Sequence, residues 1–227
     1  MIYHELGRTL SQYSEKIYCH SFNIGLLHGT LSKKHFGRFL QQDKLYLQDF
    51  ARALRETGNR FAHQPEQLLF HGLSKYILNT EIKLYDKYFP ELMPSPSLFS
   101  PPRVVKIPSV DAYTKYLLCT EAPANVAVAK LAPCFLLYKD LGVYMKPRLS
   151  KNNQYEQWVN SYTSEKFMQA SQQITQVLIT LSEKACPQTK EDMLLAFESS
   201  LKFEIAFWDE ICSPVYGETP QTMVCGI

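Results

Sequence analysis

The sequence predicts an all-α protein, a bundle of helices, on the strength of three observations. Apolar residues recur at steps of three and four over most of the chain, which places them on one face of a helix. Alternating apolar and polar runs, the usual sign of strands, are missing. Glycines number only 9, and no glycine-rich phosphate loop is present. A length of 227 residues fits one domain, residues 1–227.

The apolar pattern divides the chain into eight predicted helices. In order along the chain, these cover 3–23, 33–57, 64–89, 109–120, 124–145, 152–162, 164–184 and 188–213. The second begins after Ser32, the fourth at Ser109 and the seventh after Ser164, because serine caps the free amides at a helix start. Gly58 ends the second helix, and Gly142 lies at or near the end of the fifth.

Prolines interrupt this pattern in two places. The segment from Pro90 to Pro108 contains six prolines, which predicts an extended connector within one domain. Pro133 falls inside the predicted helix 124–145, where a proline removes one backbone hydrogen bond and usually kinks the helix. Such a kink either opens space beside Cys134 or has no functional consequence.

Three predicted helices carry a polar residue where the apolar stripe calls for an apolar one. Asp43 lies on the stripe of 33–57, Cys134 on that of 124–145 and Glu204 on that of 188–213. Burying an ionised carboxylate costs several kcal/mol unless it is paired or hydrogen-bonded. Tyr46 and Tyr138 share faces with Asp43 and Cys134, at steps of three and four. The pattern favours a polar site inside the bundle over structural ion pairs and an inert buried thiol.

Composition narrows the class of protein. Charged residues make up 20% of the chain and the net charge is +2, which favours neither nucleic acid nor an anionic membrane as a partner. The N-terminus lacks a signal-peptide core, and six scattered cysteines suit a reducing compartment, so we expect a cytoplasmic protein. Histidine and cysteine spacing supports no metal site.

Five motifs along the chain resemble the TenA family, also called thiaminase II. They are Q-D-x-x-Y at 42–46, A-Y-T at 112–114, P-C-x-x-x-Y at 133–138, W-x-x-x-Y at 158–162 and E-x-x-F-W at 204–208. The likeness covers nearly the whole chain, and Cys134 places it with the Cys-containing branch. The resemblance implies a haem-oxygenase-like bundle of about seven to eight helices, assembled as a homotetramer.

The activity that the resemblance implies is hydrolysis at the methylene on C5 of an aminopyrimidine. Family members convert 4-amino-5-aminomethyl-2-methylpyrimidine to hydroxymethylpyrimidine and ammonia for thiamine salvage, and they also cleave thiamine. Cys134 would be the nucleophile and Glu204 the proton donor, held by Tyr138, with no cofactor. The implied substrate-binding residues are Asp43, Tyr46, Tyr113, Tyr138, Tyr162 and Phe207.

Two other classes remain open on the sequence. One is an oxidative enzyme of the same fold that uses haem, metal or no cofactor. His20 could serve as an axial haem ligand, whereas Tyr85 stands four residues after Glu81 where a di-metal site would need histidine. The other is a pyrimidine-binding protein without turnover. The presence of both Cys134 and Glu204 favours the hydrolase.

Overall fold

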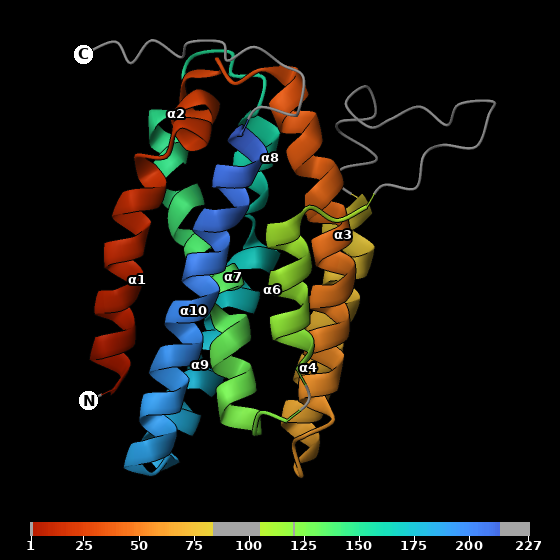
Figure 1. Ribbon diagram of the computed structural model, residues 1–227, viewed down its shortest axis with the longest axis vertical. Coiled ribbons are helices and arrows are strands. Elements are labelled where there is room, and N and C mark those ends of the chain that lie inside the picture. The colour runs from red at the N-terminus through yellow and green to blue at the C-terminus, as the bar shows by residue number, and fades with distance from the viewer. Residues whose placement is uncertain (1, 84–104, 120, 214–227) are drawn as a thin grey trace, which may run out of the picture.

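The computed structural model describes residues 2–83, 105–119 and 121–213, apart from the side chain at 81, and over these residues it is all-α (Figure 1). The fold class predicted from the sequence is confirmed. The described α-helices, nine in all, are α1 (Ile2–Tyr18), α2 (Ser21–His28), α3 (Lys33–Gly58), α4 (Gln64–Tyr76), α6 (Pro108–Leu118), α7 (Ala124–Met145), α8 (Glu156–Ser161), α9 (Glu165–Lys184) and α10 (Pro187–Cys212). A π-helical turn, η1 (Ile77–Glu81), continues α4, and a 3-10 turn, η3 (Lys146–Arg148), continues α7.

Helix α7 forms the centre of the bundle. Every residue from Val126 to Tyr138 is buried, so this helix meets neighbours on all sides. It packs chiefly against α10 and α9, while α3 packs against α4 and α6. Figure 1 shows α6 between α10 and α3, and α6 contacts both. The helices that carry the predicted site residues are therefore neighbours.

The prediction of one helix over 3–23 is wrong, because the chain breaks between α1 and α2. His20 takes an extended backbone conformation, and its ring nitrogen Nδ1 accepts the amide of Phe22, which caps α2. The predicted helix 152–162 shortens to α8 because Asn152 has a positive φ of 58°. The side chain of Asn153 then donates to the carbonyl of Leu26, which ties this loop to α2.

The predicted helix ends are partly confirmed. Ser32 caps α3 and Ser164 caps α9, and α3 ends at Gly58. The cap predicted at Ser109 is wrong, since α6 begins at Pro108 and Ile107 is its N-cap residue. Gly142 lies three residues before the end of α7, which runs from Ala124 to Met145 as predicted.

Of the two segments interrupted by proline, the structure describes Pro133 in full but only the end of the segment from Pro90 to Pro108. Of the predicted connector from Pro90 to Pro108, residues 90–104 lie outside the described part of the chain, and so do residues 84–89 of the predicted helix 64–89. Residues 105–107 precede α6. Helix α7 runs unbroken through Pro133.

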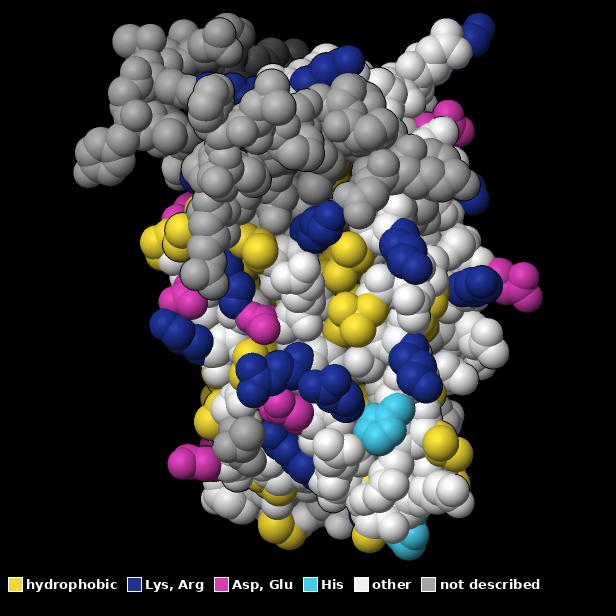
Figure 2. All heavy atoms as spheres, turned by 90° about the vertical axis from the view of Figure 1, so that its right-hand side faces the viewer, with side chains coloured by type: hydrophobic (Ala, Val, Ile, Leu, Met, Phe, Trp, Pro, Cys, Tyr) yellow, Lys and Arg dark blue, Asp and Glu magenta, His cyan; other side chains and the backbone are white. Residues whose placement is uncertain are grey.

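The outer surface is mixed in character. Figure 2 shows the side formed by α3 and α4, where Lys and Arg side chains are dispersed among acidic and hydrophobic ones. Within the described ranges, no helix combines the length and the apolar character needed to cross a lipid bilayer.

Candidate active site

Four helices and the residue that follows a fifth carry the predicted site residues. All of these side chains are buried, including two carboxyl groups and one thiol. They are Asp43 and Tyr46 on α3, Tyr113 on α6, Cys134 and Tyr138 on α7, Tyr162 directly after α8, and Glu204 and Phe207 on α10.

Glu204 is the most perturbed acid of the site. Only 1% of its surface is exposed, and the Tyr113 hydroxyl donates to its Oε1 at 3.1 Å. Burial raises the pKa of Glu204 to about 8, against the opposing hydrogen bonds from Tyr113 and Tyr138. The negative charge of Asp43 adds to the rise. At neutral pH this carboxyl therefore holds a proton that it can donate.

Tyrosines surround that carboxyl in two pairs. The rings of Tyr46 and Tyr113 lie 5.0 Å apart between centroids, and those of Tyr138 and Tyr162 lie 4.9 Å apart. Burial raises the pKa of Tyr46, Tyr113 and Tyr138 well above the ordinary value of 10.0, and the charge of Glu204 adds to each rise. These phenols stay protonated near neutral pH, so each can donate a hydrogen bond.

Cys134 lies on the side of α7 that faces these tyrosines. Its side chain is 8% exposed. A negative charge on its sulfur raises the pKa of Tyr46 and of Tyr113, so the thiol lies near both phenols. The helix around it is tied to its neighbours through buried serines. Ser200 of α10 donates to the carbonyl of Lys130 at 2.8 Å. This bond ties α7 to α10 one turn before Cys134 on α7 and one turn before Glu204 on α10.

Asp43 faces the same space from α3. It is 5% exposed. Burial is the main cause of the raised pKa of Glu204 and of Tyr138, and the negative charge of Asp43 raises both pKa values further. An electrostatic influence on two groups from two other helices indicates that all three converge. The structure thus brings together the two acids and the thiol that the sequence had placed on three separate helices.

Phe207 has a different neighbour from the tyrosines. It lies one turn after Glu204 and stacks on Phe39 of α3, with 5.3 Å between ring centroids. It remains a prediction that this ring also borders the substrate.

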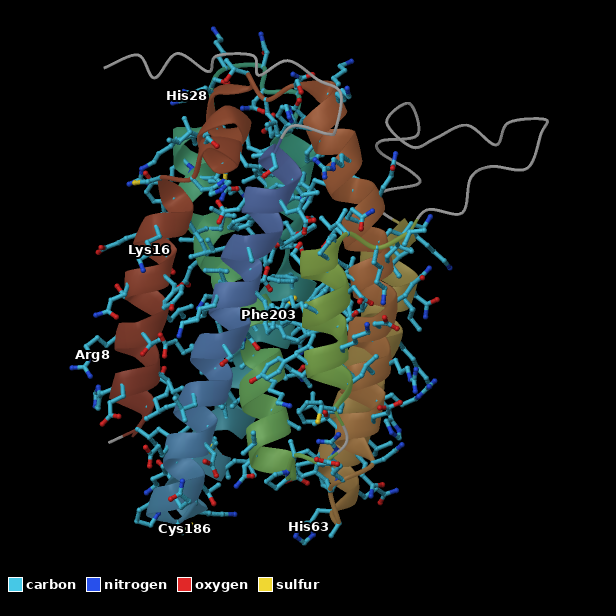
Figure 3. The ribbon with its side chains drawn as sticks, viewed as in Figure 1. Arg8, Lys16, His28, His63, Cys186 and Phe203 are labelled. Atoms are coloured by element: carbon cyan, nitrogen blue, oxygen red, sulfur yellow. The ribbon has the colours of Figure 1, made fainter. Side chains whose placement is uncertain are left out.

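Sequence reasoning missed two tryptophans and one phenylalanine that line the site. Trp158 packs edge-on to Tyr162 with centroids 4.8 Å apart, and Trp208 packs edge-on to Tyr138 at 5.7 Å. Phe203 stacks on Tyr113 at 5.1 Å, and Figure 3 shows it between α10 and α6. The signal was available, since both tryptophans occur within the quoted motifs.

The two indole nitrogens are also polar groups in an apolar setting. Nε1 of Trp158 and Nε1 of Trp208 are buried and have no hydrogen-bond partner among the described residues. A buried donor without a partner costs roughly 1–3 kcal/mol. A ligand that accepted a hydrogen bond from either indole nitrogen would therefore bind more tightly.

Of the three residues weighed for oxidative chemistry, only His20 has a described side chain. Both ring nitrogens of His20 are engaged, Nδ1 by the Phe22 amide and Nε2 by Asp209 at 3.2 Å. The side chain of Glu81 and the whole of Tyr85 lie outside the described residues. Within the part of the chain that the structure describes, no three His, Cys, Asp or Glu side chains are grouped to hold a metal ion.

The fold and the site define a class of protein, a helical bundle with a buried cluster of acids, phenols and a thiol. Residues 8–213 match the model of the TENA/THI-4/PQQC family, and the chain belongs to this family.

Similar proteins include two sequences and one solved structure. An uncharacterised protein of Haemophilus influenzae is 31% identical over 210 residues, covering 90% of this chain and 95% of that protein. The aminopyrimidine aminohydrolase of Halalkalibacterium halodurans is 27% identical over 196 residues, covering 85% and 87%. The structure of a TenA homologue from Pyrococcus furiosus superposes with a TM-score of 0.82 at 21% identity, covering 93% of this chain and 100% of that one.

Proposed function

We propose that the protein is an aminopyrimidine aminohydrolase of thiamine salvage. It would convert 4-amino-5-aminomethyl-2-methylpyrimidine to hydroxymethylpyrimidine and ammonia, with thiamine as a second substrate. Family membership and the relative named for this activity support the proposal. The observation that carries it is the buried Glu204 carboxyl, whose pKa is raised to about 8 with the charge of Asp43 nearby. The Cys134 thiol acts on Tyr113 and Tyr138, the two tyrosines that hydrogen-bond to this carboxyl.

Proton donation by Glu204 answers the main chemical difficulty of this reaction. A pyrimidine ring is a poor electrophile until one of its nitrogens is protonated, and an acid with a pKa near the working pH is the best donor. The hydroxyls of Tyr113 and Tyr138 hold the carboxyl in place through hydrogen bonds. The family resemblance implies this role for Tyr138 alone.

Cys134 would then act as the nucleophile. Its thiolate forms a bond to C6 of the ring while the ring nitrogen takes the proton from Glu204. The 4-amino group pushes electrons through the ring, and the amine, which is an ammonium at neutral pH, leaves the C5 methylene as ammonia. Water adds to the methylene carbon and releases a proton to solvent, the ring nitrogen returns its proton to Glu204, and the bond between sulfur and C6 breaks to regenerate the thiolate.

Binding of the ring would fall to the remaining residues. The Asp43 carboxylate can accept hydrogen bonds from the 4-amino group and so orient the ring. Flat aromatic walls, formed by the rings of Tyr46, Tyr162 and Phe207, suit a planar heterocycle.

The proposal includes several further predictions from the sequence and from the family resemblance. The chain would belong to the Cys-containing branch, form a single domain over residues 1–227 and assemble as a homotetramer in the cytoplasm. It would need no cofactor.

The test is an assay of ammonia and hydroxymethylpyrimidine after the purified protein is incubated with the aminomethylpyrimidine. Wild-type protein should release both in equal amounts. Cys134→Ser should lose at least about a hundredfold in rate, because a hydroxyl is a far weaker nucleophile than a thiolate. Cys186→Ser, which changes an exposed thiol at the start of α10, is the matched control and should keep the wild-type rate.

Two results would count against the proposal, at different levels. Near-wild-type turnover by Cys134→Ser would remove the covalent mechanism. Binding of the pyrimidine without any release of ammonia by the wild-type protein would instead favour a binding protein.

A further inference from the structure

The backbone that leads into α6 is held by a buried side chain of α3. Gln42 is 5% exposed, and its Nε2 donates to the carbonyl of Val105 at 3.0 Å. Its Oε1 accepts the amide of Ile107, the N-cap residue of α6, at 2.9 Å. One amide side chain thus satisfies a backbone donor and a backbone acceptor two residues apart. The pairing fixes the start of α6 against α3.

Two further contacts hold the same junction. The Lys106 ammonium pairs with the Asp49 carboxylate of α3 and donates to Thr114 at 3.0 Å. The Ser109 amide donates to Oε2 of Glu210 on α10 at 2.8 Å, which places a negative charge at the N-terminus of α6. The charge pair of Lys106 is a quarter exposed and is weakened by solvent. The buried Gln42 pairing is therefore the firmer tie to α3.

The position of α6 matters because this helix carries Tyr113. The Tyr113 ring packs between Tyr46 of α3 and Phe203 of α10, at centroid distances of 5.0 and 5.1 Å. Its hydroxyl lies 3.1 Å from Oε1 of Glu204. A hydrogen bond of that length is lost when the donor moves by a few tenths of an ångström or turns away. A small shift of α6 relative to α3 and α10 would break it.

We propose that Gln42 is a positioning residue: by pairing with the backbone at 105 and 107, it sets where α6 places the Tyr113 hydroxyl against Glu204. The inference rests on the proposed function for its catalytic meaning, since Glu204 is the proton donor there. One turn of α3 then serves two purposes. Asp43 faces the substrate, while its neighbour Gln42 holds the helix that tunes the acid.

The electrostatic surroundings of Glu204 show why the effect is measurable. The groups that act on Glu204 or on its tyrosine partners come from four helices and the residue after α8: Asp43 and Tyr46 of α3, Tyr113 of α6, Cys134 and Tyr138 of α7, Ser200 of α10, and Tyr162. Among these, the Tyr113 hydrogen bond lowers the pKa of Glu204 more than the Tyr138 bond does. Loosening α6 should therefore move that pKa upward.

The experiment replaces Gln42 by methionine, which has nearly the same shape but cannot form either hydrogen bond. The titration of Glu204 is followed by NMR of protein labelled with carbon-13 at the glutamate carboxyls, with the signal assigned through Glu204→Gln. In Gln42→Met the midpoint should rise by about half a pH unit or more. The basic limb of the pH–kcat profile should move up with it. Turnover should fall by roughly tenfold, while KM changes by less than about threefold.

Two further variants make the result specific. Gln41→Met makes the same chemical change one position earlier, where the side chain points about 100° away around α3, and it should leave the titration unchanged. Gln42→Asn adds no charge and keeps the amide on a shorter side chain that reaches the backbone at 105 and 107 poorly, so its midpoint should lie between wild type and Gln42→Met. If Gln42→Met fails to fold by circular dichroism, Gln42→Asn decides the question.

An unchanged Glu204 midpoint in a folded Gln42 variant overturns the proposal, even if the rate falls. An equal shift in Gln41→Met overturns it too, because the effect would then belong to α3 as a whole. The titration needs no turnover. If the wild-type protein releases no ammonia, the proposed function is contradicted, but the titration still tests whether Gln42 positions Tyr113.

Discussion

At the scale of single residues, two carboxyl groups share one buried space but have different surroundings. Glu204 is held by the phenols of Tyr113 and Tyr138, and its pKa of about 8 keeps it protonated at neutral pH. Asp43 acts on it as a neighbouring negative charge. Like charges in a buried space resist ionising together. This division leaves one carboxyl to donate a proton and the other to accept hydrogen bonds from an amino group.

Asp43→Asn should weaken substrate binding more than it slows the chemical step. Losing a charge-assisted hydrogen bond costs roughly 1.5–3 kcal/mol, so KM should rise by about ten- to a hundredfold. Removing the negative charge also lowers the pKa of Glu204, so the basic limb of the pH–rate profile should move down. Steady-state kinetics between pH 6 and 10 measures both. An unchanged KM with a collapsed kcat would make Asp43 a chemical group instead of an orienting one.

Glu204→Gln should damage the rate far more than binding, because the amide keeps the shape of the side chain but has no proton to give. General acid help is typically worth ~100- to 10,000-fold, and kcat should fall by a factor in that range. The wild-type rate should decline above about pH 8 as Glu204 loses its proton. The variant should lack that decline. A decline at the same pH in both proteins would assign the proton to another donor.

At the scale of helices, the path of α7 past Tyr162 depends on Gly142. A Cβ at this position would lie 2.9 Å from the Cβ of Tyr162 and 3.2 Å from Cγ2 of Thr163. Those distances are too short for a methyl group, so only glycine lets α7 approach this closely. The glycine that the sequence placed near a helix end is also a contact point. It brings the Tyr162 ring to the ring of Tyr138.

Gly142→Ala should therefore destabilise the protein and loosen the site, even though alanine is the better helix former. Overpacking of this kind typically costs about 1–3 kcal/mol, and the displaced Tyr162 should raise KM. Gly72→Ala on α4 is the matched control, because a Cβ there meets nothing within 4 Å. It should stabilise the fold by roughly 0.5–1 kcal/mol. Urea unfolding of both variants measures the difference, and equal stabilisation by both would contradict the close contact.

Helix faces could be predicted from the sequence, whereas several helix ends could not. Asp43, Cys134 and Glu204 are buried as the apolar stripes indicated, because periodicity is a local property of each helix. The cap of α6 is not local. The carboxylate that accepts the Ser109 amide belongs to Glu210, 101 residues away. The side-chain cap of α2 by His20 is local, but histidine is not among the residues favoured at that position.

At the scale of the whole molecule, the site exists only because distant parts of the chain pack together. Its predicted residues run from Asp43 to Phe207, and the apolar stripes show which face of a helix is buried but not which helix covers it. The family resemblance supplied that missing information for the motif residues. It did not reveal the part played by Gln42, whose partners are backbone atoms at 105 and 107. Every residue type has these backbone atoms, so the residues at 105 and 107 do not indicate the contact.

Burial of Glu204 should also appear in the stability of the whole molecule as a function of pH. Its pKa is raised from 4.5 to about 8, so the folded protein binds this proton more tightly than the unfolded chain. The stabilisation is fully present below about pH 4.5 and is lost as the pH rises to 8, for a total on the order of 5 kcal/mol. Glu204→Gln cannot ionise, so its stability relative to wild type should increase steadily over that interval and level off above pH 8.

Glu198→Gln on the same helix is the control, because the pKa of Glu198 is lowered by its hydrogen bond to Lys202. Its stability relative to wild type should instead change only at acidic pH. Urea unfolding from pH 4 to 9 compares the three proteins, and parallel curves for wild type and Glu204→Gln would show that Glu204 ionises freely in the folded state.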